Sequence, residues 1–132
     1  MIAMSDPDVS TRIVADVFYA GPGEEWRSTG LHPKFRLQLQ HVSPLDFYMR
    51  FINSGEAVRA RGPISFLITI NGNSFRSYRF SSGDQEYRRP IPDGWITKPG
   101  PVEIAVDIEP AKLAPDGTPY GIEVHSIGFV ER

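Results

Sequence analysis

Apolar and polar residues alternate along four separate stretches of this chain, and this alternation restricts its fold more than any other feature. In residues 35–40, 45–51, 64–70 and 102–109, every second position is apolar and most positions between are polar. Successive side chains of a β-strand point to opposite faces, so a period of two is typical of a strand with one buried face. The positions predicted to form the core are Phe35, Leu37, Leu39, Phe47, Met49, Phe51, Phe66, Ile68, Ile104 and Val106.

Four further strands are predicted, over residues 12–19, 74–80, 87–91 and 121–130. In the last of these the apolar positions change parity between Val124 and Ile127. One inserted residue in a strand reverses the alternation, so a β-bulge near His125 and Ser126 would account for the change.

The dipeptide Asn71-Gly72 is the strongest hairpin signal in the chain, because a type I′ turn needs positive φ at both central residues. It predicts that Ile70 faces Asn73 across the turn and that Ile68 faces Phe75. Twelve glycines and twelve prolines leave little room for helix elsewhere. Eight short strands separated by such turns predict an all-β fold, an antiparallel two-sheet β-sandwich of jelly-roll type.

A length of 132 residues suits one domain, predicted to span residues 11–132. Residues 1–10 are predicted to be a disordered leading segment. The long connections are predicted to be loops over residues 21–33, 53–63 and 110–120, where a rigid sandwich would carry functional groups.

Composition excludes several classes of function. The formal net charge is −2 and no run of Lys or Arg occurs, which argues against nucleic acid as a partner. No apolar run approaches the ~20 residues of a membrane span. The chain has no cysteine and residues 1–8 show no signal-peptide pattern, so we expect a cytoplasmic protein without disulfides or thiolate metal sites.

No motif of a known catalytic class is present, so neither an enzyme nor a cofactor is predicted. The three histidines are far apart in sequence, and His125 is interpreted as a strand residue. Asp84 and Glu86, or Asp116, could offer oxygen ligands to a structural Ca²⁺, but their spacing is not diagnostic and no metal site is predicted.

Aromatic side chains at strand ends and in the expected loops are the more informative signal. Flat rings with polar neighbours suit sugars, whose C–H faces pack on the ring while charged groups bind the hydroxyls. Trp26 and Trp95 could instead fold inward and cover the open ends of the sandwich, an interpretation favoured for Trp95 and left open for Trp26. The candidate ligand-binding residues are Trp26, Arg27, His32, Tyr48, Trp95 and Tyr120.

The C-terminal part carries an ordered set of motifs: residues 68–73 with the Asn-Gly turn, then Pro92-Asp93-Gly94-Trp95, then residues 102–106 and 116–129. In this order they resemble the galactose-binding-like jelly-roll modules found beside bacterial glycosyltransferases and glycan-active enzymes. Those modules enter their last strand through an Asp-Arg-x-Leu-Gly segment. Asp116 and Gly121 match it, whereas Thr118 and Tyr120 stand near the positions of the missing Arg and Leu.

The resemblance covers roughly residues 35–130 and concerns architecture more than binding residues. It implies a non-catalytic accessory module with affinity for a glycan. The alternative is a structural or protein-interaction module, with a protein partner or a second copy of this chain. Aromatic rings clustered beside polar groups would favour a glycan, whereas a flat apolar patch would favour a protein partner.

Overall fold

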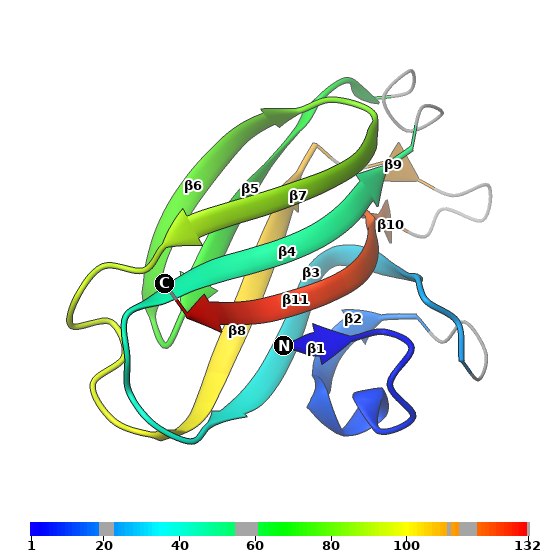
Figure 1. Ribbon diagram of the computed structural model, residues 1–132. Coiled ribbons are helices and arrows are strands. Elements are labelled where there is room, and N and C mark those ends of the chain that lie inside the picture. Colours follow the sequence, from blue (N-terminus) through cyan, green and yellow to red (C-terminus); the bar gives the residue numbers. More distant parts are fainter. Residues whose placement is uncertain (19–22, 55–60, 111, 114–118, 132) are drawn as a thin grey trace.

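A computed structural model of the protein describes residues 1–18, 23–54, 61–110, 112–113 and 119–131, and they form an all-β fold (Figure 1). Its strands are β1 (Ile2–Ala3), β2 (Ile13–Val17), β3 (Arg27–Leu39), β4 (Leu45–Asn53), β5 (Ile64–Ile70), β6 (Asn73–Phe80), β7 (Gly83–Pro90), β8 (Gly100–Glu109), β9 (Lys112–Leu113), β10 (Pro119–Tyr120) and β11 (Glu123–Glu131). One short 3₁₀ turn, η1 (Val9–Arg12), precedes β2. The eight strands of five or more residues correspond one to one with the eight predicted strands.

All strand pairs are antiparallel, and the main sheet runs in the order β6-β5-β8-β3-β11-β4-β7. Strand β1 adds to β11, β2 adds to β3, and β9 and β10 pair separately. Strand β3 joins the two ends of this path: its first residues pair with β11, and residues 34–39 pair with β8. We call β1, β11, β4 and β7 the β7 half, and β2, β3, β8, β5 and β6 the β6 half.

The sheet curls so that the two halves face each other, as Figure 1 shows. Phe51 of β4 meets Phe66 of β5 with ring centroids 5.0 Å apart, and both rings also contact Phe80. The core therefore lies between the halves, in accordance with the alternation of β4, β5 and β8. Within the described residues, no helix has the length and apolar character that a membrane crossing requires.

Nine of the ten predicted core residues are buried, and Leu39 is the exception. Leu39 is the last residue of β3 and pairs with Gly100, the first residue of β8. A side chain at the end of the sheet opposite a glycine has little to cover it, so Leu39 is only partly buried although its phase was predicted correctly.

The prediction of a loop over residues 21–33 is wrong from Arg27 onward, because β3 begins there. The apolar–polar alternation is interrupted in this part of the strand by a buried polar residue, Thr29, and by Pro33. Thr29 Oγ1 donates to the carbonyl of Gly30 and accepts from the N–H of Ile122, so its polar atom is satisfied inside the fold. Pro33, which lacks an N–H, lies just before the residues that pair with β8.

The first ten residues, expected to be disordered, contain β1 and the start of η1 in the structure. Ile2 pairs with Ile127 of β11, and Ile2, Met4 and Val9 are buried with the core. Apolar residues spaced too irregularly to show a period thus supply part of the packing between the N-terminus and β11.

The predicted hairpin and the predicted bulge are both confirmed. Asn71 and Gly72 have φ of 47° and 87°, and Ile70 pairs with Asn73 as expected for a two-residue type I′ turn. In β11 the register with β4 slips between Val124 and Ser126.

Replacing Gly72 with valine is expected to lower the free energy of unfolding by about 1–3 kcal/mol, because a β-branched residue is strained at positive φ. Asn73→Val is the matched control, since Asn73 is an exposed residue at the start of β6 and should change stability by less than about 0.5 kcal/mol. Urea denaturation of both variants measures the difference. Equal losses would mean that another turn closes this hairpin.

Candidate functional site

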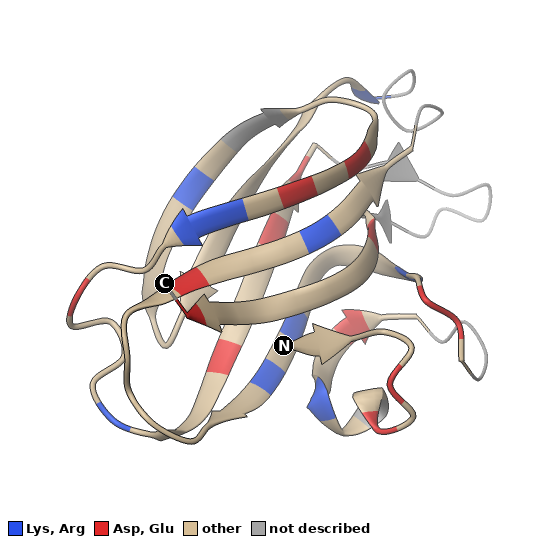
Figure 2. Ribbon diagram, viewed as in Figure 1, with Lys and Arg blue, Asp and Glu red and all other residues tan. Residues whose placement is uncertain are grey.

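Six aromatic and polar side chains gather on the outer face of the β7 half: Trp26, Tyr48, Arg50, Asp84, Glu86 and His125. We call this set the Trp26 face. Trp26 directly precedes β3, and the other five residues come from β4, β7 and β11. The register brings them together, because Arg50 pairs with Glu86 on one side and with Ser126 on the other. Figure 2 shows charged residues of both signs side by side along β4 and β7.

Arg50 is the centre of the Trp26 face. Its Nε donates to Asp84 Oδ1 at 3.1 Å and its Nη2 donates to Asp84 Oδ2 at 2.7 Å, a bidentate pair. The hydrogen bond from Arg50 lowers the pKa of Asp84, so this carboxylate is ionised at neutral pH. The Cζ of Arg50 lies 5.2 Å from the ring centroid of Trp26. An exposed ion pair adds little stability, but two parallel hydrogen bonds fix the direction of the guanidinium.

The aromatic residues of this face are also held in place. Tyr48 Oη donates to Glu86 Oε1 at 3.0 Å. Burial and the neighbouring Glu86 raise the pKa of Tyr48, so its hydroxyl keeps its proton at neutral pH. The Trp26 ring meets the His125 ring edge-on, with centroids 5.1 Å apart and an angle of 64°. The bulge in β11 therefore places His125 where it supports the indole.

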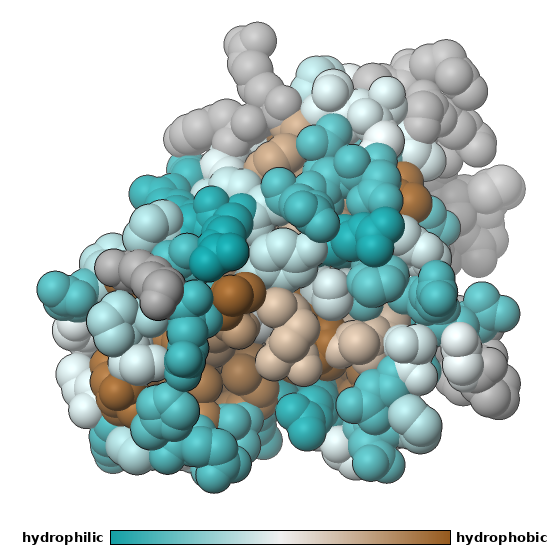
Figure 3. Space-filling view, viewed as in Figure 1, coloured by the Kyte–Doolittle hydropathy of each residue, from teal (hydrophilic) through white to brown (hydrophobic). Residues whose placement is uncertain are grey.

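This arrangement places a half-buried indole, with the Arg50 guanidinium over its ring, next to several hydrogen-bond donors and acceptors. A shallow open hollow of about 410 Å³ lies between Arg50, Asp84 and Glu86. Figure 3 shows predominantly hydrophilic residues over β7 and the adjoining part of β4. Among the described residues, no three His, Cys, Asp or Glu side chains are grouped closely enough to hold a metal ion. The face is suited to binding polar, hydroxyl-bearing molecules.

Of the five predicted site residues whose side chains the structure describes, it brings two, Trp26 and Tyr48, into this face. Arg27 is buried within β3. His32 lies in the β6 half, where its Nδ1 is 2.7 Å from Asp107 Oδ1. Trp95 stacks on Phe75, with ring centroids 5.6 Å apart, and packs against the core. The side chain of the remaining candidate, Tyr120, lies outside the described residues.

Four members of the Trp26 face were not predicted as site residues: Arg50, Asp84, Glu86 and His125. Their residue types suggest only oxygen ligands for Ca²⁺ at Asp84 and Glu86, and His125 is predicted only as a strand residue. Their proximity depends on which strands are neighbours and in which register. For Arg50 an outward position on a predicted strand was a signal that could have selected it, whereas Asp84 and Glu86 precede the predicted strand 87–91 and belong to β7 only in the structure.

Comparison with known proteins adds no further assignment. No protein-family model matches this chain, and no curated protein is significantly similar to it. The function is therefore inferred from the geometry of the Trp26 face.

Proposed function

We propose that this protein is a non-catalytic carbohydrate-binding module that holds a glycan on the Trp26 face. The observation that carries the proposal is a half-buried indole fixed beside an arginine–carboxylate pair on a regular sheet. A sugar ring packs its C–H face on an aromatic surface, while its hydroxyl pairs bind carboxylates and guanidinium groups. Asp84, Glu86 and Arg50 would bind those hydroxyls next to Trp26.

The groups of this face do not need to be ordered by the ligand. Arg50 is held by Asp84, Tyr48 by Glu86, and the indole by His125, all on paired strands or directly beside one. Binding to preorganised side chains avoids part of the entropy cost of fixing them. This favours recognition of a weakly interacting, hydroxyl-rich ligand on a shallow surface.

We further propose that the two halves are the two sheets of a jelly-roll sandwich of the galactose-binding-like kind. The Phe51–Phe66 contact across the core and the curl of the sheet support this architecture. In this proposal the module accompanies a bacterial glycan-active enzyme and binds the glycan without acting on it. The absence of cysteine from the sequence supports the cytoplasm as its location.

Trp26→Ala is expected to weaken glycan binding at least about tenfold, because the stacking surface is lost. A glycan array identifies the ligand, and isothermal titration then measures its affinity for both proteins. The melting temperature should stay almost unchanged, since Trp26 does not belong to the core cluster.

Trp95→Ala is the matched control for this experiment. It removes a ring that stacks on Phe75, so it should lower the melting temperature and leave glycan affinity unchanged. If the parent protein binds no glycan, or if Trp26→Ala binds as tightly as the parent, the proposal fails.

A specific observation favours a second candidate, a protein-interaction module that forms homodimers. Strand β2 pairs with β3, and the described residues place no strand on its other edge. Val14 and Phe18, in and just after this strand, are 44% and 39% exposed. An edge strand with exposed apolar side chains can pair with the same strand of a second copy. Sedimentation should then show a dimer that Val14→Lys dissociates, whereas a monomer at high concentration would exclude this candidate.

A further inference from the structure

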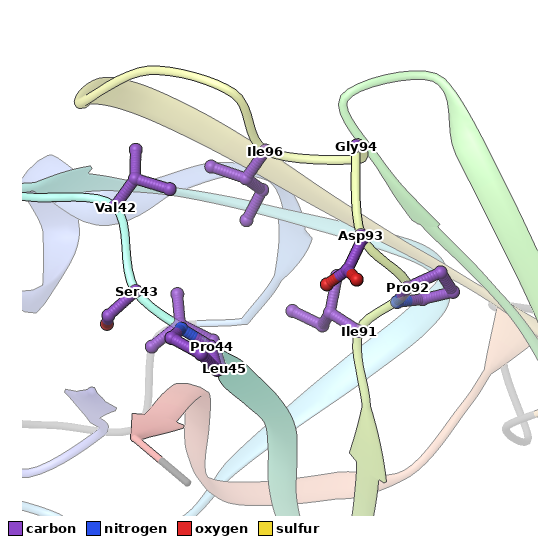
Figure 4. A pocket seen from close by; sticks show the side chains of 9 residues that line it. All are labelled: Val42, Ser43, Pro44, Leu45, Ile91, Pro92, Asp93, Gly94 and Ile96. Carbon is purple, nitrogen blue, oxygen red and sulfur yellow. The ribbon is translucent and has the colours of Figure 1, made fainter.

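A second hollow lies at the end of the sheet, between the connection of residues 40–44 and that of residues 91–99 (Figure 4). In Figure 3 hydrophobic residues gather in this region, at the lower left of the view. The hollow has a volume of about 290 Å³, at the small end of the range for ligand pockets. We call it the end hollow; its lining residues are Val42, Ser43, Pro44, Leu45, Ile91, Pro92, Asp93, Gly94 and Ile96.

The apolar part of the end hollow is well fixed. Ile91 and Leu45 are buried with the core, and the N–H of Ile91 donates to the carbonyl of Leu45 at 3.0 Å, which ties the two connections together. Val42 is 45% exposed although it is apolar, and Figure 4 shows Val42 and Ile96 on the two connections that border the space. The hollow therefore presents apolar surface that a small ligand could cover.

Asp93 is the one charged residue among those that line the end hollow. Figure 4 shows its carboxylate directed toward the space between the two connections. Within the part of the chain that the structure describes, no hydrogen bond or ion pair engages this carboxylate. The other polar side chain of the lining, Ser43, donates to Glu131 instead. A negative charge thus stands unpaired beside apolar walls.

We propose that the end hollow binds an organic ammonium ion, a small apolar group that carries one positive charge. The apolar part would cover Val42 and Ile96, and the ammonium would donate to Asp93. A charged hydrogen bond of this kind is stronger than a neutral one and is directional, so it would favour amines over alcohols and exclude carboxylates. No residue is shared with the Trp26 face, so this proposal does not depend on glycan binding.

The proposal is tested with n-butylammonium, n-hexylammonium, n-hexanol and hexanoate as probes, in NMR titrations of the full chain. Hexylammonium should bind more tightly than butylammonium by about fourfold for each added methylene that is buried. Hexanol should bind more weakly than hexylammonium, and hexanoate should not bind. Hexanoate binding as tightly as hexylammonium would overturn the proposal.

Two variants assign the binding to the end hollow. Asp93→Asn should weaken hexylammonium binding about fivefold and leave hexanol binding unchanged, since the charge is lost and the walls remain. Val42→Ser should weaken both ligands. Asp93 and Val42 are both exposed, so the variants should fold, which circular dichroism confirms. An Asp93→Asn protein with unaltered affinity for hexylammonium would refute the role of the carboxylate.

The ammonium group could belong to a free amine or to a lysine side chain. N-acetyl-lysine methylamide carries the same four-carbon ammonium as n-butylammonium, so the two probes separate these sources. Binding of both probes supports the proposal with a partner's lysine as the source. Binding of butylammonium alone supports it with a free amine as the source, and binding of neither butylammonium nor hexylammonium overturns it.

Discussion

Replacing Gly121 with alanine is expected to lower the free energy of unfolding by about 3 kcal/mol, because no space exists for a methyl group there. A Cβ at this position overlaps the carbonyl oxygen of Gly30 and comes within 2.7 Å of Ile108 Cδ1. The backbones cannot separate easily: the N–H of Gly121 donates to the carbonyl of Thr29 at 2.8 Å, and the N–H of Thr29 donates to that of Ile122 at 2.8 Å. Chemical denaturation measures the loss.

Gly94→Ala is the control that separates crowding from backbone strain. Gly94 has a φ of 90°, and a Cβ there meets nothing within 4 Å. Only the conformational penalty applies, about 1–2 kcal/mol. The Gly121 variant should therefore be the less stable of the two, and the reverse order would show that residues 29–30 and 121–122 lie farther apart than described.

Truncating Phe66 to alanine should cost about 3–5 kcal/mol of stability, the usual loss for a large buried ring. Phe66 is 1% exposed, and its ring centroid lies 5.0 Å from that of Phe51 and 5.1 Å from that of Phe80. Its removal leaves a cavity that both halves of the sheet border.

Leu67→Ala on the same strand provides the comparison, because Leu67 points to the opposite face and is only partly buried. We expect a loss of about 1 kcal/mol or less, as for most surface substitutions. Both variants are compared by thermal unfolding at one pH. Equal destabilisation would contradict the assigned phase of β5.

Strands whose two faces meet different surroundings were predictable from the sequence. The apolar residues of β4, β5 and β8 face the core and the residues between them face water. A phase assigned one residue out of step would put the apolar residues on the water side, so the correct phase of these strands can be read from the sequence. The first part of β3 was missed, because Thr29 and Gly30 are buried there for reasons of hydrogen bonding and close approach that leave no apolar pattern.

The Trp26 face could be predicted only in part. An indole within a polar segment is visible in the sequence as an exception, which is why Trp26 was selected. The contact of Trp26 with His125 joins residues 99 positions apart, and the Arg50–Asp84 pair joins residues 34 apart. Such contacts follow from strand order and register, which the alternation of single strands does not contain.

The bulge in β11 limits how related chains can change in length. Deleting one residue at the bulge would leave Val124, Ser126 and Ile127 in regular alternation, so Ile127 and Phe129 would still face the core, whereas a deletion between Ile127 and Phe129 would turn Phe129 toward water. Insertions and deletions are therefore expected in the connections between strands and, within β11, only at the bulge. Tyr48 and Arg50 point outward, while the residues beside them in the strand pack in the core. Substitutions at Tyr48 or Arg50 therefore leave the core packing intact. Binding preference can consequently diverge among descendants of this chain while the length and core of the domain stay constant.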